Sequence, residues 1–135
     1  MGHDWNAWAR RVEQALDVAK RSDTDFQSLF APDAEYVDPT QTASTSELPE
    51  VSRRTRESFP DWRTEVTSVR GAEDWAVLEW IGRGTYTSND GAGISAKIEM
   101  PGVTIVDVDT QGRVTRWRDY FDMKSVEEQI RGAAQ

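Results

Sequence analysis

The spacing of apolar residues changes once in this chain, near Asp61. Before that position they recur every three or four residues, and after it they alternate with polar residues. The first spacing keeps one face of a helix apolar, whereas alternation does the same for a strand. Helices that come first and strands that follow predict an α+β domain. In such a domain, N-terminal helices cover one face of a curved antiparallel sheet and enclose a pocket.

The first half of the chain is predicted to contain three helices, one strand and a loop. Periodicity after a capping aspartate predicts a helix over residues 4–20, and a shorter one is expected over 22–30. Ser46 can cap a third helix, whose first turn holds a proline. The alternating stretch 33–39 predicts a strand, and the polar stretch 40–46 predicts a loop.

The second half is predicted to form four strands and a closing helix. The strands are expected over 62–70, 74–88, 93–109 and 112–122, and the helix over 125–132. Glycine-containing and acidic turns separate the strands, as in a meander of hairpins. No internal repeat interrupts this order, so we predict one domain spanning residues 1–135.

Charge and composition narrow the possible partners. Sixteen Lys and Arg against 24 Asp and Glu give a net charge of −8. A surface of that sign repels phosphates, so nucleic acid and anionic membranes are not expected as partners. The N-terminus lacks the apolar core of a signal peptide, and no apolar run approaches membrane-spanning length. We therefore expect a cytoplasmic protein.

The residue types also limit the chemistry. The chain has no cysteine, and its one histidine, His3, lies beside the chain start. Disulfides, thiolate metal sites, a Ser-His-Asp triad and a multi-histidine zinc site are therefore excluded. We expect neither a metal nor a cofactor, which leaves carboxylates, tyrosines, arginines, tryptophans and water to carry any reaction.

One carboxylate stands on an apolar strand face. In "RWRDYFDM", alternation places Trp117, Asp119 and Phe121 on the same side of the final strand. Burying an unpartnered carboxylate costs several kcal/mol or raises its pKa by up to roughly 3 to 5 units. Asp119 is either a structural acceptor for a tyrosine or indole donor, or a general acid or base in a lipophilic cavity.

Two further segments supply candidates for the same cavity. Tyr36 and Asp38 share a face of the first strand, and Asp38 either faces Asp119 or caps the turn at Pro39. We favour the cavity, where repulsion between the two carboxylates would leave one protonated near neutral pH. The long second strand of the meander presents a face that is a candidate for the same side: Leu78, Trp80, Gly82, Gly84 and Tyr86. Its glycines open room for a ligand or relieve strain where the strand bends.

Four stretches of the chain resemble one known family. "LFAPDAEYVDP", "FPDWRTEVTSV", "EWIGRGTYTS" and "GRVTRWRDYFDMKSVEEQI" are similar to segments of the SnoaL-like branch of the nuclear-transport-factor-like cone fold. The resemblance spans essentially the whole chain. It implies a cystatin-like α+β cone that binds a hydrophobic small molecule, commonly as a homodimer packed through the outer sheet face. Members include polyketide cyclases, epoxide hydrolases, ketosteroid isomerases and proteins without known catalysis, so the fold alone does not define the function.

The last stretch is similar to the end of limonene-epoxide hydrolases. By that resemblance Tyr36 and Asp119 hold and activate the attacking water, and Asp38 stands where those enzymes have an asparagine. The arginine and second aspartate that protonate the epoxide correspond to Trp80 and Gly82. The water-holding half of that site is therefore present, whereas its acid half is missing.

Two other branches of the family are also similar at the site. Asp38 stands where ketosteroid isomerases carry their proton-shuttling aspartate, but their oxyanion donors fall near Ala15 and Thr104. SnoaL-type polyketide cyclases use an aspartate at the position of Asp119 for an intramolecular aldol reaction, and a histidine that assists some of them has no counterpart. Because the cyclase substrate brings its own activated carbon, cyclases are the least contradicted relatives.

The resulting expectation is cofactor-independent acid–base chemistry, cyclisation or isomerisation, on a small hydrophobic or polycyclic oxygenated molecule. The candidate catalytic groups are Asp119, Asp38 and Tyr36. The candidate substrate-binding residues are Trp80, Gly82, Trp117, Phe121, Leu78 and Tyr86. Epoxide hydrolysis of the limonene-epoxide type is one alternative, and a non-catalytic small-molecule-binding protein is the other.

Overall fold

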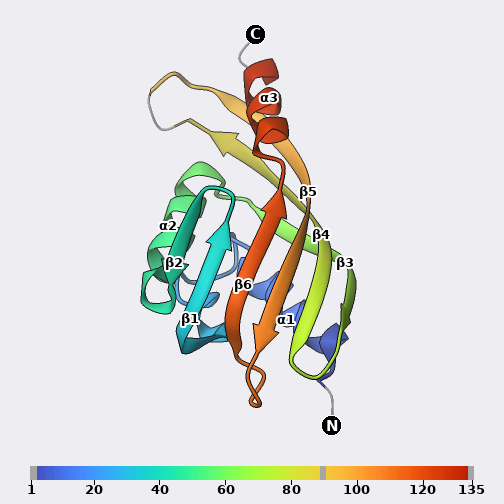
Figure 1. The fold of residues 1–135 in the computed structure, drawn as a ribbon. Helices are drawn as coiled ribbons and strands as arrows, with labels where there is room; N and C mark the ends of the chain where they lie inside the picture. Colours follow the sequence, from blue (N-terminus) through green and yellow to red (C-terminus); the bar gives the residue numbers. More distant parts are fainter. Residues whose placement is uncertain (1–2, 89–90, 134–135) are drawn as a thin grey trace.

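The computed structural model describes residues 3–88 and 91–133. Its helices are α1 (Trp5–Leu16), α2 (Leu48–Ser58) and α3 (Met123–Ala133), with short 3₁₀ turns at Gln27–Leu29 and Thr45–Glu47. Its strands are β1 (Phe30–Asp38), β2 (Gln41–Ser44), β3 (Arg63–Gly71), β4 (Trp75–Thr87), β5 (Ser95–Val108) and β6 (Val114–Phe121). Figure 1 shows one curved sheet with α1 and α2 on the same side of it. The α+β cone with N-terminal helices on the sheet is thus confirmed.

The sheet is mixed, which corrects the prediction of an antiparallel one. Its strand order is β2-β1-β6-β5-β4-β3, and β1 runs parallel to β6 with Tyr36 opposite Trp117. The other neighbouring pairs are antiparallel. A parallel pair needs a long crossover connection, and the whole of α2 and β3–β5 supplies it here.

The N-terminal half differs from the prediction in four places, the first being that α1 ends at Leu16 rather than near residue 20. Residues 41–44, predicted as loop, form β2, because a tight turn after Asp38 lets this stretch pair with β1. The helix predicted over 22–30 is mostly turns, since the chain must already be extended where β1 begins. The predicted cap Ser46 is replaced by Ser44, which forms a capping box with Glu47 ahead of α2.

The core lies between the two helices and the inner face of the sheet. Trp8, Val12 and Ala15 of α1 are buried at helical spacing, and Leu48 of α2 is fully buried. Trp117 of β6 is also buried, and its ring lies 5.0 Å from that of Phe26 and 5.8 Å from that of Phe30, centroid to centroid. Each such side chain contributes roughly 1.5–3 kcal/mol by leaving water.

Two strand glycines make room for tryptophan rings. A Cβ at Gly102 of β5 would lie 2.3 Å from a ring carbon of Trp80, which is opposite in the register. A Cβ at Gly82 of β4 would lie 2.1 Å from a ring carbon of Trp62. Both distances are far below van der Waals contact, so these positions hold indoles against the backbone.

Replacing Gly102 by Ala is expected to displace Trp80 and lower the free energy of unfolding by about 1–3 kcal/mol through overpacking. Gly132→Ala is the matched control, because no heavy atom lies within 4 Å of a Cβ there. Alanine also favours the helix at that position, so the control should stay within about 1 kcal/mol of the parent or gain stability. Urea unfolding measures both. Equal stability of the two variants would contradict this account of Trp80.

Candidate functional site

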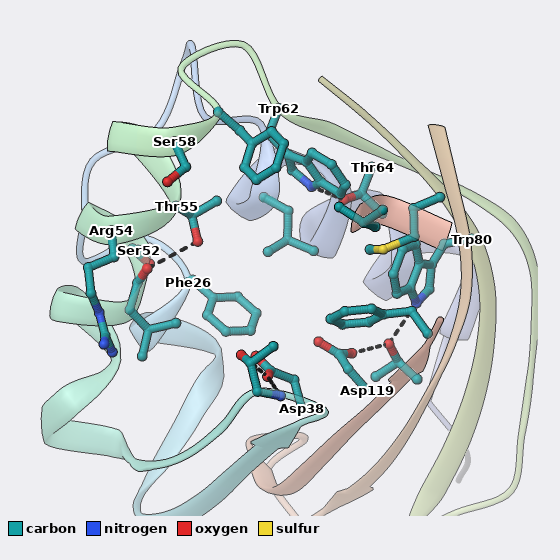
Figure 2. A pocket seen from close by; sticks show the side chains of 18 of the residues that line it. Phe26, Asp38, Ser52, Arg54, Thr55, Ser58, Trp62, Thr64, Trp80 and Asp119 are labelled. Atoms are coloured by element: carbon teal, nitrogen blue, oxygen red, sulfur yellow. Dashed lines mark hydrogen bonds between the residues drawn. The ribbon is translucent and has the colours of Figure 1, made fainter. Parts of the chain in front are cut away.

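A cavity of about 590 Å³ lies between the helices and the inner face of the sheet. Most of its lining is apolar or aromatic, and that part of the wall comprises Val12, Leu16, Phe26, Val51, Phe59, Trp62, Val66, Leu78, Trp80, Tyr86, Ile98, Met100, Trp117, Phe121, Met123, Val126 and Ile130. Figure 2 shows Asp38 and Asp119 at one end of the cavity and Ser58 and Trp62 toward the other. A mostly apolar cavity with few polar groups is typical of a small-molecule site.

Asp119 projects from β6 into this cavity and is held by one of its two oxygens. Oδ1 accepts hydrogen bonds from the Thr104 hydroxyl at 2.5 Å and from the Trp117 indole N–H at 2.8 Å. Thr104 of β5 is opposite Asp119 in the register, and its hydroxyl accepts from the Trp80 indole at 2.8 Å. An indole N–H can only donate. These donors therefore commit Oδ1 as an acceptor and leave Oδ2 as the oxygen available for a proton.

Asp38 performs both roles proposed for it. Its Oδ1 accepts from the Thr40 backbone N–H at 2.7 Å and the Thr40 hydroxyl at 2.6 Å, which closes the turn after β1. Its Oδ2 accepts from the Tyr36 hydroxyl at 2.6 Å and from Gln41 Nε2 at 3.2 Å. Asp38 also lines the cavity, as predicted from the strand alternation.

The Tyr36 hydroxyl lies between the two carboxyl groups. It is 2.6 Å from Asp38 Oδ2 and 3.3 Å from Asp119 Oδ2, yet a phenol has only one proton to donate. The shorter contact assigns that proton to Asp38. A hydrogen bond between Tyr36 and Asp119 then requires Asp119 to be the donor, through a proton on Oδ2.

The electrostatics favour the same assignment. Burial is the main cause that raises the pKa of Asp119 from its ordinary value to about 7, and the charge of Asp38 raises it further. Hydrogen bonds that Thr104, Trp117 and Tyr36 can donate to the ionised carboxylate lower this pKa and act in the opposite direction. Burial, followed by the charges of the two carboxylates, raises the pKa of Tyr36 well above its usual range, so its hydroxyl keeps its proton.

Together these groups form a hydrogen-bonded chain that can hold and move one proton. With Asp119 protonated, its Oδ2 would donate to the Tyr36 hydroxyl at 3.3 Å while Tyr36 donates to Asp38 at 2.6 Å; with Asp119 ionised, Tyr36 can donate to Asp119 Oδ2 instead. A carboxyl whose pKa lies near neutrality can both give and take a proton at physiological pH. The arrangement can therefore act as a general acid or a general base on a molecule in the cavity.

Five of the six predicted substrate-binding residues line the cavity: Leu78, Trp80, Tyr86, Trp117 and Phe121. The sixth, Gly82, lies beneath the Trp62 ring and is not among the lining residues of the described chain. Alternation identified its face of β4 but could not show that a distant indole covers it.

Sequence reasoning missed several polar residues that line the cavity, of which four matter for the site: Thr104, Gln41, Arg21 and Ser52. Thr104 had a signal, because it shares its strand face with the buried Val106 and Val108. A hydroxyl on an apolar face suggests a polar partner across the strand. The other three follow from how the first half of the chain folds back on the sheet, which spacing alone does not indicate.

Two further searches cover residues 3–88 and 91–133. Within these ranges no group of three or more His, Cys, Asp and Glu side chains is placed to hold a metal ion. In the same ranges no helix is long and apolar enough to cross a bilayer.

Comparison with solved structures places the fold among known ones. A protein assigned as a SnoaL-like polyketide cyclase from Shewanella putrefaciens CN-32 shares 13% identity, covering 98% of this chain and 88% of its own, with a TM-score of 0.78. A hypothetical protein of ketosteroid isomerase-like fold from Catenulispora acidiphila DSM 44928, solved with trimethylamine, shares 21% identity over 88% and 89%, with a TM-score of 0.73.

A third structure, AclR from Streptomyces galilaeus, assigned as a hydroxylase, shares 16% identity over 90% of this chain and 85% of its own, with a TM-score of 0.68. At these identities the structures establish the fold alone. No curated protein matches the sequence. The family model of the SnoaL-like domain, however, matches residues 7–117, most of the chain. With the cone fold and the matching motifs, this places the protein in the SnoaL-like domain family.

Proposed function

We propose that the cavity binds a small hydrophobic, oxygenated molecule and that Asp119 transfers a proton to or from it, in a cyclisation or isomerisation. The observation that carries the proposal is that the two oxygens of the Asp119 carboxyl have different hydrogen-bond partners. Two donors hold Oδ1, while Oδ2 is turned toward Tyr36 and is the oxygen available for a proton. The reaction needs only these side chains, so the proposal calls on no cofactor.

In the proposed step, ionised Asp119 removes a proton from a carbon beside a carbonyl group, and the acid later returns it. The hydrogen bonds from Thr104 and Trp117 persist in both states, so they position the carboxyl. One of the oxyanion donors of ketosteroid isomerases corresponds to a position near Ala15, and an alanine side chain cannot donate a hydrogen bond. A substrate whose carbon is already activated by its own substituents therefore fits this site best.

Epoxide hydrolysis has less support. Tyr36, Asp38 and Asp119 could orient a water molecule, which favours that reaction. The acid half would need an arginine and an aspartate at Trp80 and Gly82, but the Trp80 indole is bonded to Thr104 and Gly82 lies under Trp62. A non-catalytic binding protein remains the alternative from another class, and the first experiment below separates it from an enzyme.

The first test is proton exchange on 2-tetralone, a bicyclic ketone of suitable size, in D₂O. The protein is expected to accelerate exchange of the protons beside the carbonyl, followed by ¹H NMR. Asp119→Asn should slow the catalysed exchange by roughly 100-fold or more, while affinity, measured by tryptophan quenching, stays within about threefold. Binding without exchange by the parent would favour the non-catalytic protein. Equal exchange by parent and variant would rule out Asp119 as the base.

The second test is the pH dependence of that exchange. The base is ionised Asp119, whose pKa is about 7, so the rate should rise with pH and level off above that value. The negative charge of Asp38 contributes to the raised pKa, so Asp38→Asn should move the midpoint to lower pH. A midpoint near 4 in the parent would contradict the buried, protonated acid.

The third test is the pH dependence of stability. The unfolded chain ionises Asp119 near pH 3.9, whereas the folded protein does so near pH 7. Stability is therefore lost as the pH rises between these values, by on the order of 4 kcal/mol in total. An asparagine imitates the protonated acid, so Asp119→Asn should equal the parent near pH 4 and exceed it at pH 8.

Urea unfolding at the two pH values measures the difference between parent and variant. Asp33→Asn is the control, because Asp33 is exposed on β1. This control should change stability by less than about 0.5 kcal/mol at either pH. If the free energy of unfolding differs between the parent and Asp119→Asn by the same amount at both pH values, Asp119 is ionised in the folded protein throughout.

A further inference from the structure

Arg21 lines the cavity without a carboxylate partner. Among the described residues, the three other half-buried arginines, Arg53, Arg83 and Arg118, each form an ion pair, whereas Arg21 forms none within 4.0 Å. Its Nη1 donates to the Ala15 carbonyl at 3.3 Å and its Nη2 to the Ser52 carbonyl at 3.2 Å. The guanidinium thus joins the end of α1 to the middle of α2 and still has N–H groups to donate.

The position is unfavourable for a cation on its own. Burial is the main cause that lowers the pKa of Arg21, and the charges of nearby aspartates offset it in part. A buried charge is stable only when a counter-charge or a full set of hydrogen bonds compensates for lost water. A bound anion at this wall would provide that compensation.

A second observation lies on the same wall. Ser52 is only 2% exposed, and its hydroxyl has no hydrogen-bond partner in the described part of the chain. Buried hydroxyls are nearly always bonded, so an unpartnered one calls for an explanation. Figure 2 shows Ser52, Thr55 and Ser58 of α2 along the side of the cavity that faces Trp80. Because a serine side chain is short and rotates between staggered positions, this hydroxyl can turn toward a ligand.

We propose that Arg21 and Ser52 form a subsite that binds a carboxylate group of the substrate. The inference rests on the proposed function, since it takes the cavity to be the substrate site. A guanidinium matches a carboxylate geometrically and in charge, and a serine hydroxyl adds a donor. Asp38 and Asp119 repel a carboxylate from the other end of the cavity. The substrate is therefore oriented, with its carboxylate at α2 and its reacting carbon at Asp119.

The test compares two probes of the same shape, 1-hydroxy-2-naphthoate and its neutral primary amide, by calorimetry at pH 7.5. The parent should bind the carboxylate about 10- to 100-fold more tightly than the amide, as expected for charge-assisted hydrogen bonds. Arg21→Met should remove this preference by weakening carboxylate binding, with amide binding unchanged. Arg21→Lys, which keeps the charge, should retain part of the preference.

Two variants control for charge and folding. Arg10→Met removes the same charge from an exposed position of α1 and should leave the preference intact. Ser52→Ala should weaken carboxylate binding about threefold or more without lowering the unfolding midpoint, because the hydroxyl has no partner to lose. Should Arg21→Met fail to fold, the parent's preference and the Ser52 variant still decide the matter.

The outcomes separate the subsite from the proposed function. Equal binding of both probes by the parent, or a preference that survives Arg21→Met, overturns the subsite alone. Binding of neither probe overturns the cavity as a site for such molecules, and the subsite with it. A carboxylate preference without any exchange of 2-tetralone supports the subsite in a binding protein and counts against catalysis.

Discussion

The carboxyl of Asp119 is buried inside an apolar cavity, and the surrounding strands are arranged so that this burial is tolerated. Thr104 reaches it from the neighbouring strand, Trp117 from the same strand, and Tyr36 from the parallel strand on the other side. Three strands thus contribute to one functional group. Without these hydrogen bonds, the cost of removing the Asp119 carboxyl from water would favour a conformation in which it points to solvent.

Periodicity predicted the α+β class and the inner face of the last strand because both depend on near neighbours in the sequence. It did not predict the parallel pairing of β1 with β6 or the strand β2, since these depend on which distant segments meet. Asp119 could be identified because the eight residues of "RWRDYFDM" are enough to show a charged side chain on an apolar strand face. Thr104 was overlooked because threonine is common in strands, so its hydroxyl stood out less than a carboxylate.

The site shows where a local pattern stops being informative. Asp38 was described by two competing interpretations, and its two oxygens satisfy both, one in the turn and one toward Tyr36. Gly82 was placed on the correct face of β4, but Trp62, twenty positions earlier, covers it. Arg21, which follows the end of α1, bonds to the Ser52 carbonyl of α2 across 31 positions of sequence, and the spacing of apolar residues gives no guide to such a contact.

The pairing of β1 with β6 also affects when the site can form. Tyr36 and Asp119 are separated by 83 positions, so the chain closes a long loop before their contact exists. The β3–β5 meander consists of nearer neighbours and can form earlier during folding. A transient opening that releases β1 would therefore separate the acid from the tyrosine while the meander stayed intact. In this fold the chemistry depends on β1, the second strand from one end of the sheet, and local opening there would inactivate the site before the protein unfolds.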